Sequence, residues 1–237
     1  MLIFPSSSAH AVVFDATTNG NWLGYMNVFE NNNGAYVLEI AWGTTELRAN
    51  AQSEDPNILE LRPNSNAYAD SPRGIDADRA YWTNSEDGGV IPGPDGNQWM
   101  EASYYLEAEG DNTAWNGQSL TFSGTIGDVT LNNRYSTVAF IKTLDVDNDY
   151  ATIQNTVESI SSTGDFEWSL DILEGNYIAQ MGFTISGLNA NPNTQLGLIE
   201  LTDLEATGVP EARIYALLAG FARSYLLRPA KAKIARS

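Results

Sequence analysis

Apolar and polar residues alternate along several stretches of the chain. Every second residue is apolar in 100–108, and the same period of two holds in 166–172 and in 177–185. Successive side chains of a β-strand point to opposite faces of a sheet, so this period predicts half-buried strands with one polar face. Between residues 12 and 208, no segment has a sustained helical period.

Other short apolar runs, bounded by Asn-, Gly- and Pro-rich turns, extend this pattern. They are residues 22–30, 36–40, 58–61, 79–83, 119–126, 137–146, 151–157 and 197–204. Many short strands with frequent turns are typical of a sandwich. We therefore predict an all-β fold: a single jelly-roll-like β-sandwich of two antiparallel sheets over residues 12–208, followed by a short C-terminal helix. The Pro- and Gly-rich stretch 62–97 predicts a long loop.

Composition narrows the chemistry that is open to this fold. The chain of 237 residues has 30 Asp and Glu against 12 Lys and Arg, a net charge of −18, so we expect no binding to nucleic-acid phosphates. It has no cysteine and one histidine, His10, in a segment that we expect to be removed. Without these side chains a Ser-His-Asp triad, a thiolate metal site or an imidazole base is impossible. We predict no enzyme, with a two-carboxylate glycoside hydrolase as a remote alternative.

The two ends of the chain suggest export. Ala9-His10-Ala11 has the small-x-small form of a signal-peptidase site, so residues 1–11 are predicted to be the remnant of a truncated signal peptide. An ordinary chain end is the alternative. Residues 209–237 contain half of the Lys and Arg residues but a single acid, Glu211. A C-terminal amphipathic helix with a basic face is one reading of this segment.

The other reading is a resemblance to a known sorting signal. The segment resembles the PEP-CTERM sorting domain, in which a Pro-Glu-Pro-like motif precedes a membrane-spanning helix and a basic cluster. The matching residues are Val209, Pro210, Glu211, Tyr215, Ala216, Leu217, Leu218, Ala219 and Gly220. Ala212 replaces the second proline, Arg223 interrupts the apolar run, and Pro229 ends it, whereas a span needs about 20 apolar residues. The sorting signal is therefore degenerate.

The resemblance implies a location and a partner. PEP-CTERM proteins are exported by Gram-negative bacteria, processed by an exosortase-type enzyme and delivered to the cell surface or the extracellular polysaccharide. Contact with the membrane would be transient and made through the tail alone. We accordingly expect a secreted, non-catalytic component of the cell surface or of the extracellular polysaccharide matrix.

A carbohydrate-binding module is the alternative function. The segments 117–124, 139–142 and 177–183 resemble strands of jelly-roll carbohydrate-binding modules. Such modules stack exposed aromatic rings on sugars. We predict sugar contacts by Trp82, Trp99, Tyr105 and Trp115, because Tyr105 lies on the polar face of its strand and Trp82 follows Tyr81 in an expected strand. Burial of these rings in the core is the alternative, and Trp168, in phase with an apolar face, is predicted to be core.

One acidic turn suggests a cation. Asp145, Asp147 and Asp149 have the spacing that opens a calcium loop, although Tyr150 and Thr156 occupy the positions where an EF-hand has glycine and an acid. A surface Ca²⁺ site on these three residues is one possibility and a solvated acidic turn is the other. No other cofactor is implied.

Overall fold

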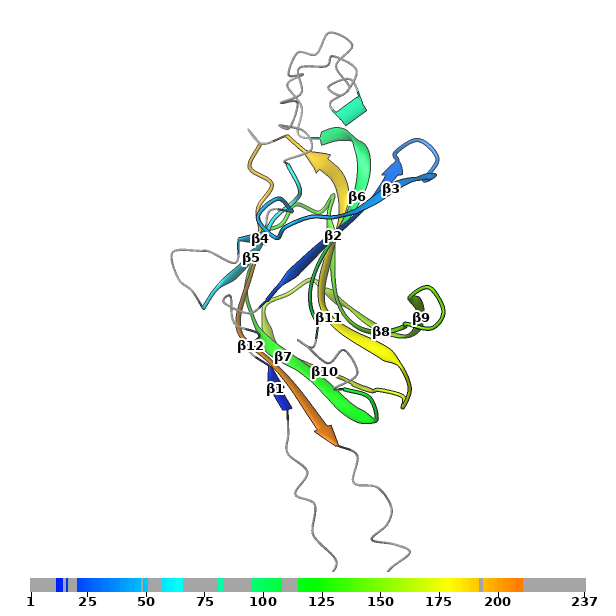
Figure 1. Cartoon of the computed structure of the whole chain (residues 1–237). Helices are drawn as coiled ribbons and strands as arrows, with labels where there is room; N and C mark the ends of the chain where they lie inside the picture. Colours follow the sequence, from blue (N-terminus) through cyan, green and yellow to red (C-terminus); the bar gives the residue numbers. More distant parts are fainter. Residues whose placement is uncertain are drawn as a thin grey trace, which may run out of the picture.

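The structure is a computed structural model of the chain. It describes residues 12–14, 16, 21–47, 49–50, 57–65, 81–82, 95–107, 115–191 and 194–210. Within these residues the fold consists of two antiparallel sheets, which confirms the predicted all-β sandwich (Figure 1). No helix of the described residues is long and apolar enough to cross a membrane.

Sheet A contains six strands. They are β1 (Val12–Phe14), β4 (Ala49–Asn50), β5 (Leu59–Leu61), β7 (Gln118–Val129), β10 (Gly164–Asp171) and β12 (Ile199–Pro210). The order is β10-β7-β12-β5-β4, and β1 also pairs with β12. The long β7 and β12 form the middle of this sheet.

Sheet B also contains six strands. They are β2 (Leu23–Glu30), β3 (Tyr36–Ala41), β6 (Asp95–Glu107), β8 (Ser136–Asp145), β9 (Ala151–Ile160) and β11 (Tyr177–Ala190). The order is β3-β2-β6-β11-β8-β9, so β6 and β11 lie in the middle and β3 and β9 are the edges. In Figure 1 the edge strands β3 and β9 lie on the right of the molecule, and β4 and β5 of sheet A lie on the left. We call the face of sheet B that points away from sheet A its outer face.

The core forms between the inner faces of the sheets. On β6 the predicted apolar positions Met100, Ala102, Tyr104 and Leu106 are all buried. Across the sandwich, the rings of Phe122 on β7 and Phe183 on β11 have centroids 5.2 Å apart. Trp168 stacks on Phe166 and packs against this core, as its phase predicts. Aromatic rings of this size dominate the apolar area that a sandwich buries.

Two sequence-based boundaries are corrected. Residues 79–83 were expected to form a strand, but Tyr81 and Trp82 have helical backbone, and the rest of that range lies outside the described residues. The domain was expected to end at residue 208, but β12 continues to Pro210, where Val209 pairs with Ser119 of β7. The predicted signal remnant and the predicted C-terminal helix lie outside the described residues.

Candidate functional site

The outer face of sheet B carries two of the four aromatic side chains that the sequence predicts as sugar contacts, Trp99 and Tyr105. On β6 the alternate residues Trp99, Glu101, Ser103, Tyr105 and Glu107 lie on this face, opposite the buried positions of the same strand. Antiparallel pairing brings neighbouring strands into register with them, with Phe29 of β2 opposite Trp99 and Asn27 opposite Glu101.

One end of this face contains an open hollow of about 320 Å³, which we call the hollow. Its lining residues are Phe29, Glu30, Asn31, Gly34, Trp99 and Glu101. The volume is at the lower end of the range for small-molecule sites. The side chain of Trp99 is 36% exposed, an unusually open position for the largest apolar side chain of the strand.

The turn between β2 and β3 forms one side of the hollow. It has the sequence Asn31-Asn32-Asn33-Gly34, in which Gly34 has a φ of +68°, a conformation that glycine adopts without strain. The backbone N–H of Gly34 donates to the carbonyl of Glu30, and the N–H of Ala35 donates to Oδ1 of Asn33. These bonds fix the turn and hold Glu30 and Asn31 at the rim.

Three aromatic rings lie in register across this end of the sheet. Tyr36 of β3 is opposite Phe29, which is opposite Trp99. The rings of Phe29 and Tyr36 meet edge to face with centroids 5.9 Å apart, and Tyr36 is 55% exposed. This geometry leaves aromatic surface available to a ligand.

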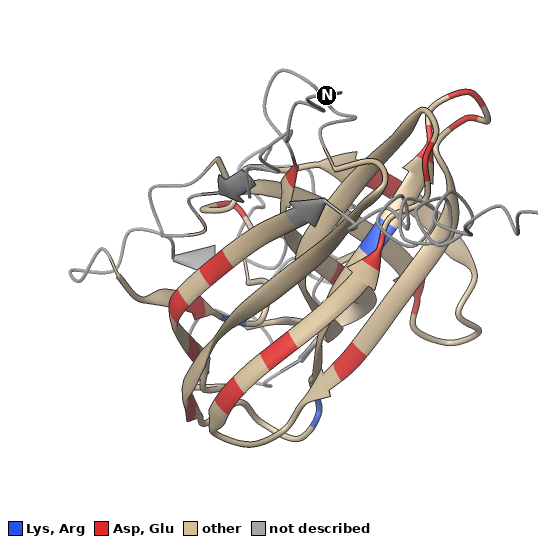
Figure 2. Cartoon of the chain, turned by 90° about the horizontal axis from the view of Figure 1, so that it is seen from below, with Lys and Arg blue, Asp and Glu red and all other residues tan. Residues whose placement is uncertain are grey.

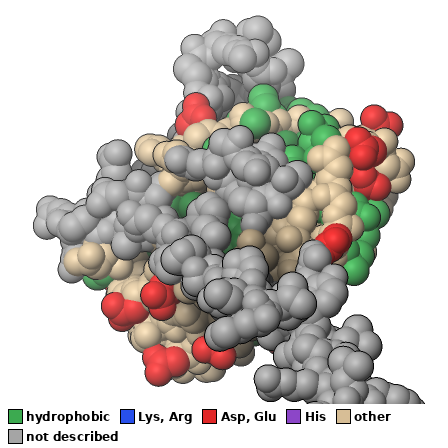
Figure 3. Space-filling model, turned by 60° about the horizontal axis from the view of Figure 1, so that its bottom comes forward, with side chains coloured by type: hydrophobic (Ala, Val, Ile, Leu, Met, Phe, Trp, Pro, Cys, Tyr) green, Lys and Arg blue, Asp and Glu red, His purple; other side chains and the backbone are tan. Residues whose placement is uncertain are grey.

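Negative charge surrounds these rings. Glu101 lines the hollow from the same face as Trp99, while Glu30 lines it at the end of β2, opposite the buried Gln98. Glu39 accepts a hydrogen bond from the hydroxyl of Tyr25 on the neighbouring strand. Burial first, and then this bond and the charge of Glu39, raise the pKa of Tyr25 to about 12. Acidic residues are spread over both sheets in Figure 2, and no basic side chain is visible among the coloured atoms of the face drawn in Figure 3.

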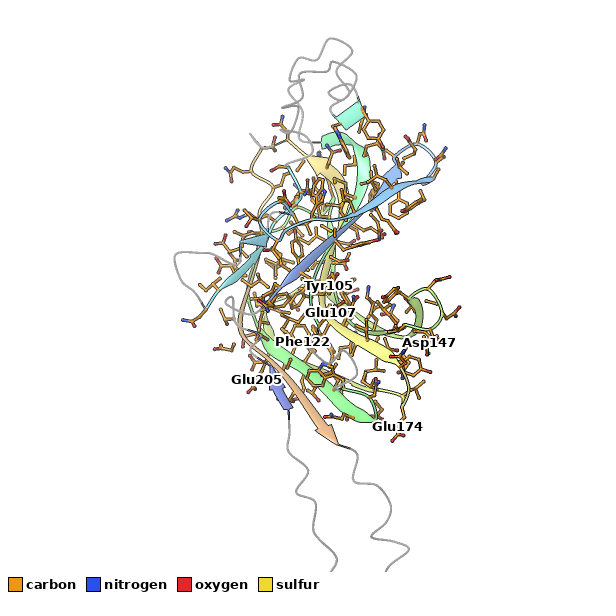
Figure 4. The ribbon with its side chains drawn as sticks, in the orientation of Figure 1. Tyr105, Glu107, Phe122, Asp147, Glu174 and Glu205 are labelled. Atoms are coloured by element: carbon orange, nitrogen blue, oxygen red, sulfur yellow. The ribbon has the colours of Figure 1, made fainter. Side chains whose placement is uncertain are left out.

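The middle of the same face has a different arrangement, which we call the Lys142 cluster: Tyr105, Glu107, Phe140, Lys142 and Gln180. The ammonium Nζ of Lys142 lies 5.0 Å from the ring centroid of Phe140 and 5.9 Å from that of Tyr105. Nε2 of Gln180 donates to Oε1 of Glu107. Figure 4 shows Tyr105 and Glu107 beside one another at the centre of the sheet. The cluster is thus held together by its own contacts.

Burial shifts two pKa values in the Lys142 cluster. Loss of solvent lowers the pKa of Lys142, and the charge of Glu107 opposes that change. Loss of solvent also raises the pKa of Tyr105, and Glu107 adds to it. Gln180 and Phe140 are both buried, although they belong to the outer face.

The four predicted sugar-contact residues do not form one site. Trp99 lines the hollow, and Tyr105 belongs to the Lys142 cluster. Trp82 is half-buried against the core, and its carbonyl accepts a hydrogen bond from Nδ2 of Asn189. Trp115 is wrong as a contact, because its ring is 0% exposed and packs where a Cβ at Gly208 would lie.

Several residues that line the hollow, and Tyr36 beside it, were not identified from the sequence. Phe29, Tyr36, Glu30 and Glu101 were not among the predicted contacts. The signal for Phe29 is present, because Tyr25, Asn27 and Phe29 share one face of a strand whose other face carries the buried Met26 and Val28. The pairing of β2 with β6, which no local pattern reveals, is what places Phe29 beside Trp99.

The structure does not gather the carboxylates of Asp145, Asp147 and Asp149 into one cation-binding group. No group of three or more His, Asp or Glu side chains among the described residues, which include 145–149, is arranged to hold a metal ion. Oδ1 of Asp145 instead accepts a hydrogen bond from the backbone N–H of Asp147, and Oδ1 of Asp147 accepts one from Nδ2 of Asn176 (Figure 4). The carboxylates of Asp145 and Asp147 therefore hold the β8–β9 turn in place.

Comparisons with known proteins do not assign a family. No family model and no curated protein matches the chain. The enzymatically active domain of tailspike protein 4 of bacteriophage CBA120 is 11% identical over 46% of this chain and 15% of its own, with a TM-score of 0.30. The GH31 α-xylosidase of Xanthomonas citri is 11% identical over 90% of this chain and 21% of its own, with a TM-score of 0.23. At such scores no functional inference rests on either likeness.

Proposed function

We propose that the protein binds a polysaccharide on the outer face of sheet B and does not cleave it. The observation that carries this proposal is the exposed ring of Trp99, which lines an open hollow together with carboxylate and amide side chains. The remaining features of the face explain how a sugar would be held there.

A sugar ring presents C–H groups on its faces and hydroxyl groups around its edge. An aromatic ring accepts the first kind of surface, and a carboxylate accepts hydrogen bonds from the second. The hollow offers both, since Trp99 and Phe29 supply rings while Glu101 and Asn31 supply polar groups at the rim. A groove with apolar walls and a few polar groups is the usual form of a small-molecule site.

The chain ends supply a setting for this activity. In this proposal the protein is secreted, processed by an exosortase-type enzyme at its tail, and retained on the surface or in the polysaccharide of a Gram-negative cell. The support is the residue pattern of the tail, from Val209 to Gly220, together with the Ala9-His10-Ala11 motif. A polysaccharide ligand would be abundant at that location.

The test is retention on insoluble polysaccharides, preceded by a glycan array to choose them. Trp99→Ala is expected to weaken retention at least tenfold, about 1.4 kcal/mol of binding free energy, with little change in stability. Tyr150→Ala is the matched control, since it also removes an exposed ring, 57% exposed, but from the turn between β8 and β9. Equal retention of wild type and Trp99→Ala would refute binding at the hollow.

A structural role in the matrix is the second candidate, and edge strand β9 favours it. Ile153 and Val157 are 42% and 47% exposed on a ten-residue strand whose one charged side chain is Glu158. Exposed apolar edge strands pair readily with other strands. If two copies pair antiparallel with Asn155 opposite Asn155, Ile153 faces Val157 twice and Glu158 faces Thr152. Such an interface is self-complementary and closes a dimer.

Sedimentation velocity over a range of concentrations tests this second role. The wild-type chain is expected to dimerise, and Val157→Lys is expected to keep it monomeric because it places charge at both apolar contacts. Ile178→Val, a conservative change at a buried position of the same sheet, should leave the dimer intact. A wild-type chain that is monomeric at every concentration would remove this candidate.

A further inference from the structure

Among the described residues, the carboxylate of Glu101 in the hollow has no cationic partner. Glu101 lines it from the outer face of β6, whereas Glu30 lies opposite the buried Gln98 and contributes to the lining from the end of β2. None of the described residues that line the hollow is Lys, Arg or His. Among the described residues the one salt bridge joins Arg62 to Glu60, in another part of the molecule. The hollow therefore presents the negative charge of Glu101 beside an exposed indole ring.

These groups together match a positively charged ligand. The face of an aromatic ring attracts a cation, and tryptophan does so most strongly. Register places Phe29 next to Trp99 and Tyr36 next to Phe29, so that a row of rings begins in the hollow that Glu101 also lines. An ammonium group in the hollow would gain from the rings and from the charge of Glu101 at the same time.

Other classes of sugar gain less from the same groups. A neutral sugar would stack on the rings, but its binding would remove water from a carboxylate without placing a cation beside it, which costs binding free energy. An acidic sugar would be repelled by Glu101, and by the net charge of −18 carried by the chain. The same net charge attracts a cationic polymer before contact.

Building on the proposed function, we infer that the hollow selects an amino sugar whose amine is free and protonated. The ligand class is then a deacetylated or partly deacetylated polysaccharide. The ammonium group lies between the ring of Trp99 and the carboxylate of Glu101, and the sugar ring extends over Phe29.

Calorimetric titration of the full chain tests this selection. The probes are a β-1,4-linked glucosamine hexasaccharide and the fully N-acetylated hexasaccharide of the same linkage. At about pH 6, where exposed carboxylates are ionised, the free-amine probe is expected to bind at least tenfold more tightly. The preference should disappear when the pH is raised above the pKa of the sugar amine. Glu101→Gln should reduce the preference for the free-amine probe, and Trp99→Ala should weaken the binding of both probes.

Two controls separate selection from general attraction. Glu158→Gln removes one exposed acid from β9 and should leave the preference unchanged. A hexalysine peptide carries positive charge without a sugar and should bind weakly, with no dependence on Trp99. Binding of both oligosaccharides with equal affinity, lost in Trp99→Ala, would overturn the amine selection and leave the proposed function standing. Binding of neither oligosaccharide would overturn the amine selection, and the proposed function would then depend on the retention test with Trp99→Ala. Hexalysine binding as tightly as the free-amine probe would also overturn the selection.

Discussion

The hollow and the Lys142 cluster lie on the same face of sheet B and contain similar side chains, yet the partners of their charged groups differ. Both combine aromatic rings with glutamate on β6, and Trp99 and Tyr105 are six residues apart on that strand, about 20 Å. In the Lys142 cluster Glu107 accepts a hydrogen bond from Gln180, and the ammonium group of Lys142 lies near two rings. In the hollow, none of the described lining residues places a cation beside Glu101.

The neighbouring strands explain this difference. The Lys142 cluster lies on the side of β6 where the next strands of the sheet are the long β11 and β8. These strands supply Gln180 and Lys142, in register with Glu107. The hollow lies beside the turn between β2 and β3, and the strand opposite Glu101 on that side supplies Asn27. Polar residues in the middle of a sheet therefore satisfy one another, whereas those beside a turn stay available to a ligand.

The largest expected effect comes from Gly182, which lies under the Lys142 cluster. Gly182 is opposite Tyr105 on β6 and Phe140 on β8. A Cβ at this position would lie 2.7 Å from Cα of Tyr105 and closer still to the carbonyl oxygen of Tyr104. Because the obstacle is backbone, Gly182→Ala should lower the free energy of unfolding by about 3 kcal/mol or more, measured by urea denaturation.

Gly127→Ala is its matched control. Its Cβ would have its nearest neighbour, Cβ of Glu200, at 3.7 Å, an ordinary contact. This variant should change stability by less than about 1 kcal/mol. Similar urea midpoints for the two variants would show that β6 and β11 can separate at Gly182 without cost.

The second effect contrasts the acids of the two regions. Gln180 is 5% exposed, and its amide donates to Glu107. Gln180→Leu keeps the volume and removes the donor, so it should cost about 1–3 kcal/mol of unfolding free energy. Glu101→Gln in the hollow breaks no such bond and should stay within about 0.5 kcal/mol of wild type. Equal losses in the two variants would remove the distinction between the satisfied cluster and the open hollow.

The alternation in the sequence predicted the strands and their faces because it depends on local geometry. Residues 100–107 show this clearly, since the period of two assigned Tyr104 to the core and Tyr105 to the outer face. The same reasoning places Phe166 and Trp168 against the core. A two-residue period requires no knowledge of which strand is the neighbour.

The site depended on contacts that a local pattern does not contain. Trp115 precedes β7 in a turn, where no alternation indicates a face, and its burial follows from packing against Gly208 on β12. The pairing of β2 with β6 joins segments about 70 residues apart, as in Phe29 opposite Trp99. Residue type was sufficient to suggest Trp99, but the hollow around it required the register of three strands.

The smallest effect concerns the charge of Lys142. Loss of solvent lowers the pKa of its ammonium group in the folded chain below the ordinary value of 10.5. The unfolded chain therefore holds more protons than the folded one between the lowered pKa and 10.5. Stability should consequently rise with pH through this interval, because the cost of burying the charge disappears once the group is neutral in both states.

Lys142→Met removes that cost at every pH and retains most of the apolar stem. The variant should match or exceed wild type by about 1 kcal/mol near neutral pH, and the gap should close as the pH rises toward 10.5. Glu107 and Tyr105 also face this ammonium group, and the charge of Glu107 favours its protonated form. In a Glu107→Gln variant that retains Lys142, unfolding free energy should therefore depend on pH more strongly than in wild type. Urea denaturation at a series of pH values measures both effects. A Lys142→Met variant that is less stable than wild type at every pH would contradict this prediction. It would mean that the contacts of the ammonium group with Phe140 and Tyr105 outweigh the cost of burying it, so that the charge of Lys142 stabilises the fold.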